Sequence, residues 1–225
     1  MSLQAQRGVA GERARSVTAS RRGAERSAAA RSQCYAAFSE LTASPHEVDA
    51  PPGIGDRIGV AAGLPFPIAG IDELLREFAA ADAARLKSEY SELFEVGSQG
   101  PPAPIREDLH TGQKAGTRED IVRFYDYFGY RLDDRFAWAP DHLSVELEFM
   151  HFLCFHEAEQ SGDRLSWQRA QADFAHRHLA SWVPQLARAV SELTADSFYC
   201  RVLFALSDFI ARDLEWQAST IVEER

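Results

Sequence analysis

Residues 139–157 read APDHLSVELEFMHFLCFHE, and this stretch decides the fold class. Its second half, residues 149–155 (FMHFLCF), would be apolar on nearly every side of a helix, which is typical of a helix buried at the centre of a protein. Its first half carries four ionisable side chains, Asp141, His142, Glu146 and Glu148. We therefore expect a central helix over residues 141–160 with a polar amino end.

Apolar residues at helical spacing recur on both sides of this central segment. The expected further helices cover residues 32–43, 71–94, 117–128, 165–193 and 197–217. Pro184 must kink or restart one of them, and Asp196 is a suitable amino-terminal cap for the last. Residues 44–70 and 96–116 are Pro- and Gly-rich and predict loops, the first with at most one short helix. Because no alternating strand pattern appears, the sequence predicts an all-α fold, a single globular bundle of about six to nine helices.

Composition and charge narrow the classes of function. The 225 residues are 45% hydrophobic, without an apolar run long enough to cross a membrane. The net charge is −10, but residues 1–31 hold seven arginines and two glutamates, which leaves −15 on the rest of the chain. A negative charge of this size on residues 32–225 disfavours nucleic acid as a partner, because phosphate binding needs clustered Lys and Arg. The three cysteines are far apart, so neither a disulfide framework nor a zinc knuckle is expected, and a reducing cytosol fits best.

Residues 1–31 are rich in Arg, Ala, Ser and Gly and almost free of large apolar side chains. This composition predicts a disordered basic tail in front of a helical domain over residues 32–225. Ser20-Arg21-Arg22 resembles the start of a twin-arginine signal, but Gly-Ala-Glu-Arg-Ser follows instead of an apolar segment. We therefore do not expect export, whereas the Arg-rich composition leaves an organelle transit peptide open.

A metal site is the first chemistry to consider. Glu148-Phe-Met-His151 has the E-x-x-H spacing of di-iron helix bundles, and Asp173-Phe-Ala-His176 is a possible second copy with Asp for Glu. Such a site also needs an inward carboxylate on each of two further helices, and no other expected helix places one cleanly on its apolar face. We expect no bound metal, and keep a di-iron or other metal-binding enzyme as the alternative function.

The amino end of the central helix allows two interpretations. Asp141 can serve as the helix cap, with Glu146 and Glu148 stabilised by the helix dipole in the first turns. Alternatively, Asp141 and His142 form part of a polar pocket beside Trp138. The usual phosphate-loop, dinucleotide-binding, hydrolase and zinc-protease motifs are absent, so no catalytic residue is expected.

Several segments together resemble one protein family. Tyr90-Ser-Glu-Leu-Phe94, followed by Gly97 and Pro101-Pro102, is similar to the Y-x-x-L-F motif and Pro-rich loop of the TorD/DmsD/NarJ-type chaperones. The string from Pro140 to Met150 (PDHLSVELEFM) and the pattern from His178 to Pro184, then Phe198-Tyr199, resemble the same family. The resemblance spans about residues 32–216 and is strongest to the branch that serves type II dimethyl sulfoxide reductase family molybdoenzymes.

This resemblance implies an all-helical cytosolic chaperone, not an enzyme. Such a chaperone binds the apo catalytic subunit of a molybdoenzyme, often through its twin-arginine signal peptide, and delays export until molybdopterin guanine dinucleotide is inserted. It holds no permanent cofactor, although transient contact with that cofactor is expected. The family's acid-Pro-x-Asp-His hinge maps onto Asp141 and His142, but Ala139-Pro140 stands here where the family has its acid.

A twin-arginine signal presents two guanidinium groups and then an apolar segment, so its site needs carboxylates and an aromatic or aliphatic groove. The candidate signal-peptide and client-binding residues are Tyr90, Phe94, Trp138, Asp141, His142, Glu146 and Glu148. A plain scaffold without preference for a signal peptide is a further alternative. The client's identity, any cofactor-binding residue and the choice between monomer and dimer stay open.

Overall fold

The computed structural model describes residues 26–46, 57–98, 100–112, 115–132, 139–159 and 164–221. Helices account for its regular structure, apart from two isolated bridges, and the predicted all-α class is confirmed. Residues 26–42 form an N-terminal helix. The α-helices that follow are α2 (Ile71–Ala80), α3 (Ala83–Phe94), α4 (Glu107–His110), α5 (Thr117–Phe128), α6 (Leu143–Glu159), α7 (Arg164–Phe174), α8 (Val183–Leu193) and α9 (Phe198–Thr220). A 3-10 turn over Val60–Gly63 and a π-helical turn over Ala175–Leu179 complete the described helices.

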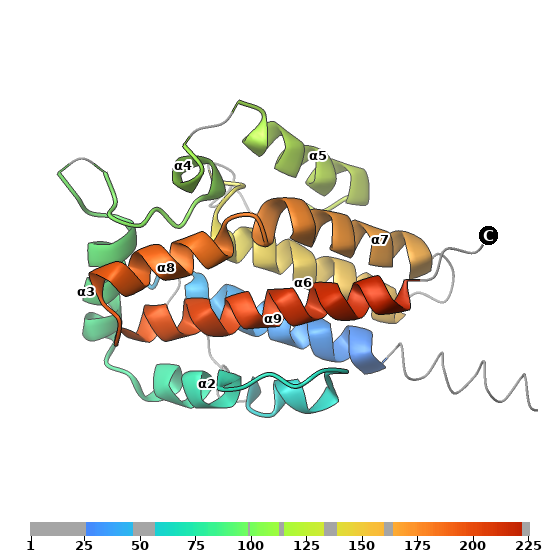
Figure 1. Ribbon diagram of the computed structural model, residues 1–225, viewed down its shortest axis with the longest axis horizontal. Helices are drawn as coiled ribbons and strands as arrows, with labels where there is room; N and C mark the ends of the chain where they lie inside the picture. Colours follow the sequence, from blue (N-terminus) through green and yellow to red (C-terminus); the bar gives the residue numbers. More distant parts are fainter. Residues whose placement is uncertain are drawn as a thin grey trace, which may run out of the picture.

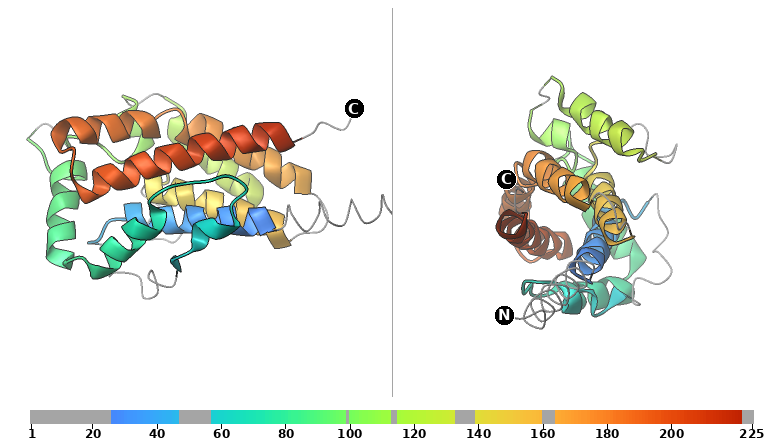
Figure 2. Two further views of the ribbon diagram at one scale, coloured as in Figure 1. Left: turned by 60° about the horizontal axis from the view of Figure 1, so that its bottom comes forward. Right: turned by 90° about the vertical axis from the view of Figure 1, so that its right-hand side faces the viewer.

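The N-terminal helix, α6, α7 and α9 lie side by side along the long axis of the molecule (Figure 1). Their ends face the viewer in the right-hand view of Figure 2, where α5 stands outside this group. Helix α6 buries ten of its 17 residues, in agreement with its apolar sequence on all sides. The predicted central helix is therefore the core of the bundle, and α4 and α5 cover its amino end.

The predicted helix over residues 71–94 is wrong in one respect, because it is two helices. Ala81 is extended (ψ 149°), and the Asp82 carboxylate accepts a hydrogen bond from the Ala84 amide at 3.1 Å, which starts α3. Helices α2 and α3 consequently run in different directions (Figure 1). Both helices keep their apolar side chains toward the core, so the periodicity of the sequence did not reveal the break.

Helix boundaries near the carboxyl end depend on local caps. Pro184 lies in the first turn of α8, so a new helix begins there. This is the second of the two predicted outcomes, a kink or a restart. The cap of α9 is Ser197 and not the predicted Asp196, because the Ser197 hydroxyl accepts the Cys200 amide at 3.1 Å. The predicted loop over 96–116 contains the single-turn helix α4.

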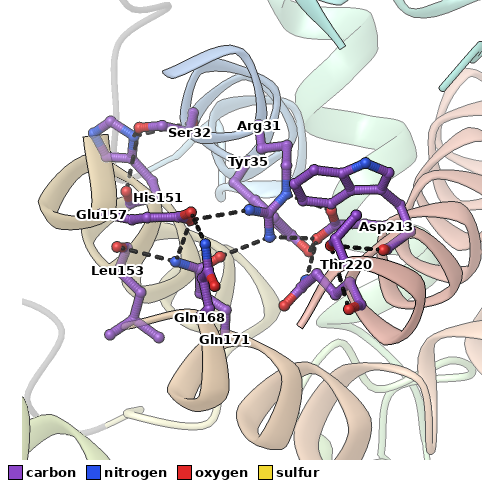
Figure 3. Close-up of polar contacts among 12 residues, drawn as sticks. Arg31, Ser32, Tyr35, His151, Leu153, Glu157, Gln168, Gln171, Asp213 and Thr220 are labelled. Atoms are coloured by element: carbon purple, nitrogen blue, oxygen red, sulfur yellow. Dashed lines mark hydrogen bonds and ion pairs between the residues drawn. The ribbon is translucent and has the colours of Figure 1, made fainter. Parts of the chain in front are cut away.

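A buried arginine fixes the N-terminal helix to the bundle (Figure 3). The Arg31 side chain is fully buried, and its Nε donates to Asp213 Oδ1 at 2.5 Å. Its terminal nitrogens donate to Glu157 Oε2 at 3.2 Å and to Gln171 Oε1 at 2.6 Å. Tyr35, one turn later, donates to Asp213 Oδ2 at 2.7 Å. These bonds join the N-terminal helix to α6, α7 and α9, and the nearby carboxylates raise the pKa of Arg31 despite its burial.

This cluster corrects the predicted boundary between tail and domain. Residues 26–31 are helical, and Ser27, Ala28 and Arg31 are buried, so the folded part includes residues that were assigned to the tail. Residues 1–25, which hold the rest of the predicted tail, lie outside the described residues.

Candidate functional site

The amino end of α6 is a junction built on Asp141. The Asp141 carbonyl accepts the Glu107 amide at 2.9 Å, and its carboxylate accepts the Asp108 amide at 3.3 Å. Both bonds satisfy amides in the first turn of α4, so Asp141 caps α4, whereas the sequence predicted that it could cap its own helix. Its carboxylate also binds Arg106 at 3.0 Å and lies 3.5 Å from Arg118 of α5. A fully buried carboxylate thus holds α4 and α5 against α6.

His142 occupies the cap position of α6. Its Nδ1 accepts the Ser144 amide at 3.2 Å, and its Nε2 lies 3.0 Å from the Tyr90 hydroxyl on α3. Burial lowers the pKa of His142 to about 4; Arg106 acts in the same direction, and Asp141 opposes it. The ring is therefore neutral near pH 7, and it links the core of α3 to the start of α6.

Glu146 lies one turn further along α6 and is fully buried. Neither of its carboxyl oxygens makes a hydrogen bond of normal geometry with a described residue, although the side chains of Trp182 and Glu107 lie close to it. Burial, together with the nearby carboxylates of Glu107 and Asp141, raises the pKa of Glu146 well above its ordinary value, which favours the protonated form of this carboxyl group. Glu107 in turn pairs with His178 Nδ1 at 2.9 Å. The junction is a closed polar cluster that positions α4, α5 and the π-helical turn η3 (Ala175–Leu179) around α6.

The structure brings part of the predicted site together. Asp141, His142 and Glu146 meet at this junction, and Tyr90 joins them through its hydroxyl. Tyr90 and Phe94 are otherwise core residues, 1% and 4% exposed, and both rings pack edge-on against Tyr199.

One further member of the predicted set, Glu148, does not take part in the junction. Glu148 is exposed and belongs to another face of α6. There the pKa of Tyr130 is raised, mainly by the burial of Tyr130 itself and secondly by the nearby charge of Glu148. Trp138 lies outside the described residues, so the pocket expected beside it stays a prediction. The role of the whole set in client binding stays a prediction.

An open groove lies on the outer side of α3, against the turn between α8 and α9, and both elements are at the same end of the bundle (Figure 1). It encloses about 430 Å³. Three carboxylates line it, from Glu89, Glu92 and Asp196, next to the apolar side chains of Leu93, Pro102 and Leu193. No basic side chain is among the lining residues, so the groove offers negative charge beside apolar surface.

Sequence reasoning missed this outer face. Glu92 and Leu93 lie inside the Y-x-x-L-F segment, between the two aromatic residues that were selected. The acids Glu89 and Glu92 are three residues apart and therefore share a helix face, which is a signal the sequence did contain. The contribution of Asp196 from a distant turn could not be read from the sequence.

The residues of the di-iron alternative do not converge. His151 Nδ1 lies 2.8 Å from the Ser32 hydroxyl and 3.0 Å from the Ser32 carbonyl, Asp173 pairs with Arg177 at 2.9 Å, and Glu148 is exposed. Within the part of the chain that the structure describes, no group of three or more His, Cys, Asp or Glu could hold a metal ion. In the same part, no helix has both the length and the apolar character needed to cross a membrane.

The fold and the sequence define the class of protein. A solved structure from Archaeoglobus fulgidus, described as a redox enzyme maturation protein, superposes with a TM-score of 0.50 at 21% identity and covers 80% of this chain and 93% of its own. This likeness shows the fold, that of an all-helical maturation protein. The sequence profile of the nitrate reductase delta subunit matches residues 59–188, and the chain belongs to this family, which includes the TorD- and NarJ-type proteins.

Curated relatives agree with this assignment. The selenate reductase assembly chaperone protein of Thauera selenatis is 33% identical over 68% of this chain and 83% of its own length. The perchlorate reductase assembly chaperone protein of Dechloromonas aromatica is 34% identical over 54% of this chain and 57% of its own length. The predicted membership in the TorD/DmsD/NarJ-type chaperones, and with it the expectation that the chain is not an enzyme, is confirmed.

Proposed function

We propose that this protein is the assembly chaperone of a type II dimethyl sulfoxide reductase family molybdoenzyme. It binds the apo catalytic subunit in the cytoplasm, assists insertion of the molybdenum cofactor and delays export until insertion is complete. The observation that carries the proposal is the 33% identity to a selenate reductase assembly chaperone over 83% of that protein. The molybdopterin cofactor is cargo destined for the client, and no residue of this chain is assigned to hold it.

A binding experiment on the client tests this function. The full chain is mixed with the catalytic subunit of a selenate- or chlorate-type reductase, prepared in apo form and in cofactor-loaded form. We expect a stable complex with the apo form, little binding of the loaded form, and a higher molybdenum content when the chaperone is present during loading. Equal binding of both forms, or no binding of either, would refute the proposal.

The acidic groove on α3 is the proposed contact for the twin-arginine segment of the client. Glu92 and Asp196 are exposed on opposite sides of the groove, so two guanidinium groups can reach them from solvent. Charge-assisted, bidentate bonds favour arginine over lysine at such sites. Leu193 is 52% exposed and offers apolar surface to the segment that follows the arginines.

The predicted residues enter this proposal according to their burial. In the described conformation, Tyr90, Phe94, Asp141 and Glu146 cannot touch a client, because each is at most 4% exposed. We propose that they keep α3 and α4 in place beside the groove, and that direct contact through them requires α4 and α5 to move. His142 belongs to the same supporting set, since its contact with Tyr90 joins α3 to the start of α6.

A labelled signal peptide with an Arg-Arg pair, compared with its Lys-Lys version, tests the groove by fluorescence anisotropy. Neutralising two half-exposed contacts in E92Q/D196N should cost about 1–2 kcal/mol, which is about five- to thirtyfold in affinity. The control E119Q/D126N removes two charges that are also exposed, on α5, and should leave the affinity unchanged. Equal losses in both double variants would assign the effect to net charge and not to the groove.

A further inference from the structure

A second groove runs between α5 and α7, which lie next to each other in Figure 1 and in the right-hand view of Figure 2. It encloses about 560 Å³ and is separate from the acidic groove on α3. Phe124, Phe128 and Ala170 form its apolar lining, and Arg123, Tyr127 and Arg169 are exposed beside them. None of these six residues takes part in the junction at Asp141.

The aromatic lining is held rigidly. Phe128 packs on Trp167 with ring centroids 5.3 Å apart, and Phe124 packs edge-on against Phe174 at the same separation. Tyr127, by contrast, is 81% exposed and touches only the edge of Phe128, at 4.9 Å. Because the exposed ring of Tyr127 adjoins a fixed apolar lining, the two together form a continuous surface that a partner can cover.

The charges at this groove are not balanced. Its two carboxylates, Asp120 and Asp173, both bind Arg177, at 3.3 Å and 2.9 Å. Arg123 and Arg169, one from each helix, make neither an ion pair nor a hydrogen bond with any described residue. On a chain with net charge −10, this site therefore presents two unmatched guanidinium groups beside aromatic surface.

We propose that the α5–α7 groove is a docking surface for an amphipathic segment of a partner protein that carries carboxylates beside large apolar side chains. Apolar side chains of the segment cover Phe124, Phe128 and Tyr127, and its carboxylates pair with Arg123 and Arg169. The groove is open along the surface, whereas small-molecule sites enclose most of their ligand, so a protein segment is the better fit. Arginine and tyrosine are also the residues that most often dominate the binding energy of protein interfaces.

The probe is a fluorescein-labelled amphipathic helical peptide with a Leu/Phe stripe flanked by Glu, together with versions that carry Gln or Lys instead. Anisotropy titrations use the full chain. The Glu peptide should bind saturably, and R123E/R169E should weaken it about tenfold or more, because two attractive contacts become repulsive. The control R76E/R188E changes the net charge equally on two other exposed helix positions and should have little effect. Tyr127→Ala should also weaken binding without changing the charge.

The Lys peptide provides the reversal. It should bind R123E/R169E more tightly than R76E/R188E, since only the first variant places acids at the groove. Equal affinity of the wild type for the Glu and Lys peptides, or equal losses in the two double variants, overturns the proposal. A dimer in sedimentation that dissociates in R123E/R169E would also overturn it, because the occupant would then be a second copy of this chain. Displacement of the peptide by millimolar inorganic phosphate would overturn it as well. Because the probe is synthetic, the result does not depend on the proposed chaperone function.

Discussion

Replacing Asp213 by Asn should destabilise the protein by about 3 kcal/mol. Asp213 and Arg31 are both fully buried, and the carboxylate accepts hydrogen bonds from Arg31, Tyr35 and Gln217. Asparagine removes the charge and turns one acceptor into a donor that faces other donors. Breaking a buried pair costs about 3–5 kcal/mol. The lower value applies here, because Glu157 still faces the guanidinium at 3.2 Å.

The assay is urea unfolding followed by circular dichroism, with equal m-values required for wild type and variant. Asp208→Asn is the matched control, since Asp208 lies on the same helix but pairs with Arg212 at the surface, where both side chains are over 40% exposed. A surface pair of this kind contributes about 0–1 kcal/mol, so the control should change little. Hydrogen exchange of residues 26–42 should accelerate only in D213N, because that helix loses its main polar anchor.

The reasoning is refuted if D213N costs less than about 1 kcal/mol, a value in the range of an ordinary exposed pair. It is also refuted if D213N and D208N cost the same, since burial would then have no influence. A large loss without faster exchange in the N-terminal helix would show that Asp213 stabilises α9 by itself and does not hold the two helices together.

Three further predictions concern the junction at α6. The pKa of His142 is about 4 in the folded protein and 6.5 in the unfolded chain. The stability that the neutral ring contributes is therefore present above pH 6.5 and is lost as the pH falls toward 4. In urea unfolding, wild type should lose about 3 kcal/mol more stability than H142Q over this interval. Glu146 has the opposite sign, because its folded pKa is raised. The unfolded chain ionises first, so E146Q should gain stability relative to wild type as the pH rises above about 4.5. Finally, Asp141→Asn should accelerate hydrogen exchange over residues 107–128, where its bonds end; unchanged exchange there would show that it does not anchor α4 and α5.

The helices with a strong apolar stripe were predictable from sequence, and so was the central position of α6. The break between α2 and α3 was not, because the cap on Asp82 interrupts the backbone without disturbing the apolar pattern. The N-terminal boundary was missed for a different reason. Residues 26–31 have no large apolar side chain, and the burial of Arg31 depends on Asp213, 182 positions later in the sequence.

The candidate site was predictable as a region but not as a surface. The resemblance selected Tyr90 and Phe94, and the structure places both in the core. The apolar spacing of α3 already places Tyr90 on its inner face, where it packs against Tyr199, but the resemblance does not separate core residues from contact residues. Glu92 lies on the face left to solvent and lines the groove with Asp196. Such a groove exists only after two segments about a hundred residues apart come together.

The bond between Arg31 and Asp213 also limits the order in which the helices can dock during synthesis. The N-terminal helix leaves the ribosome first, yet the carboxylate that neutralises its arginine lies in the last helix. Until α9 is synthesised, this helix can bury Arg31 only against Glu157 and Gln171, without the carboxylate of Asp213 that makes the shortest of its bonds, and an incompletely paired buried charge is costly. Final docking of the first helix must therefore wait for the last one. In a chain that stops before Asp213, the N-terminal helix would lack the carboxylate that holds Arg31 and Tyr35. We therefore expect this helix to pack firmly only after α9 has been synthesised.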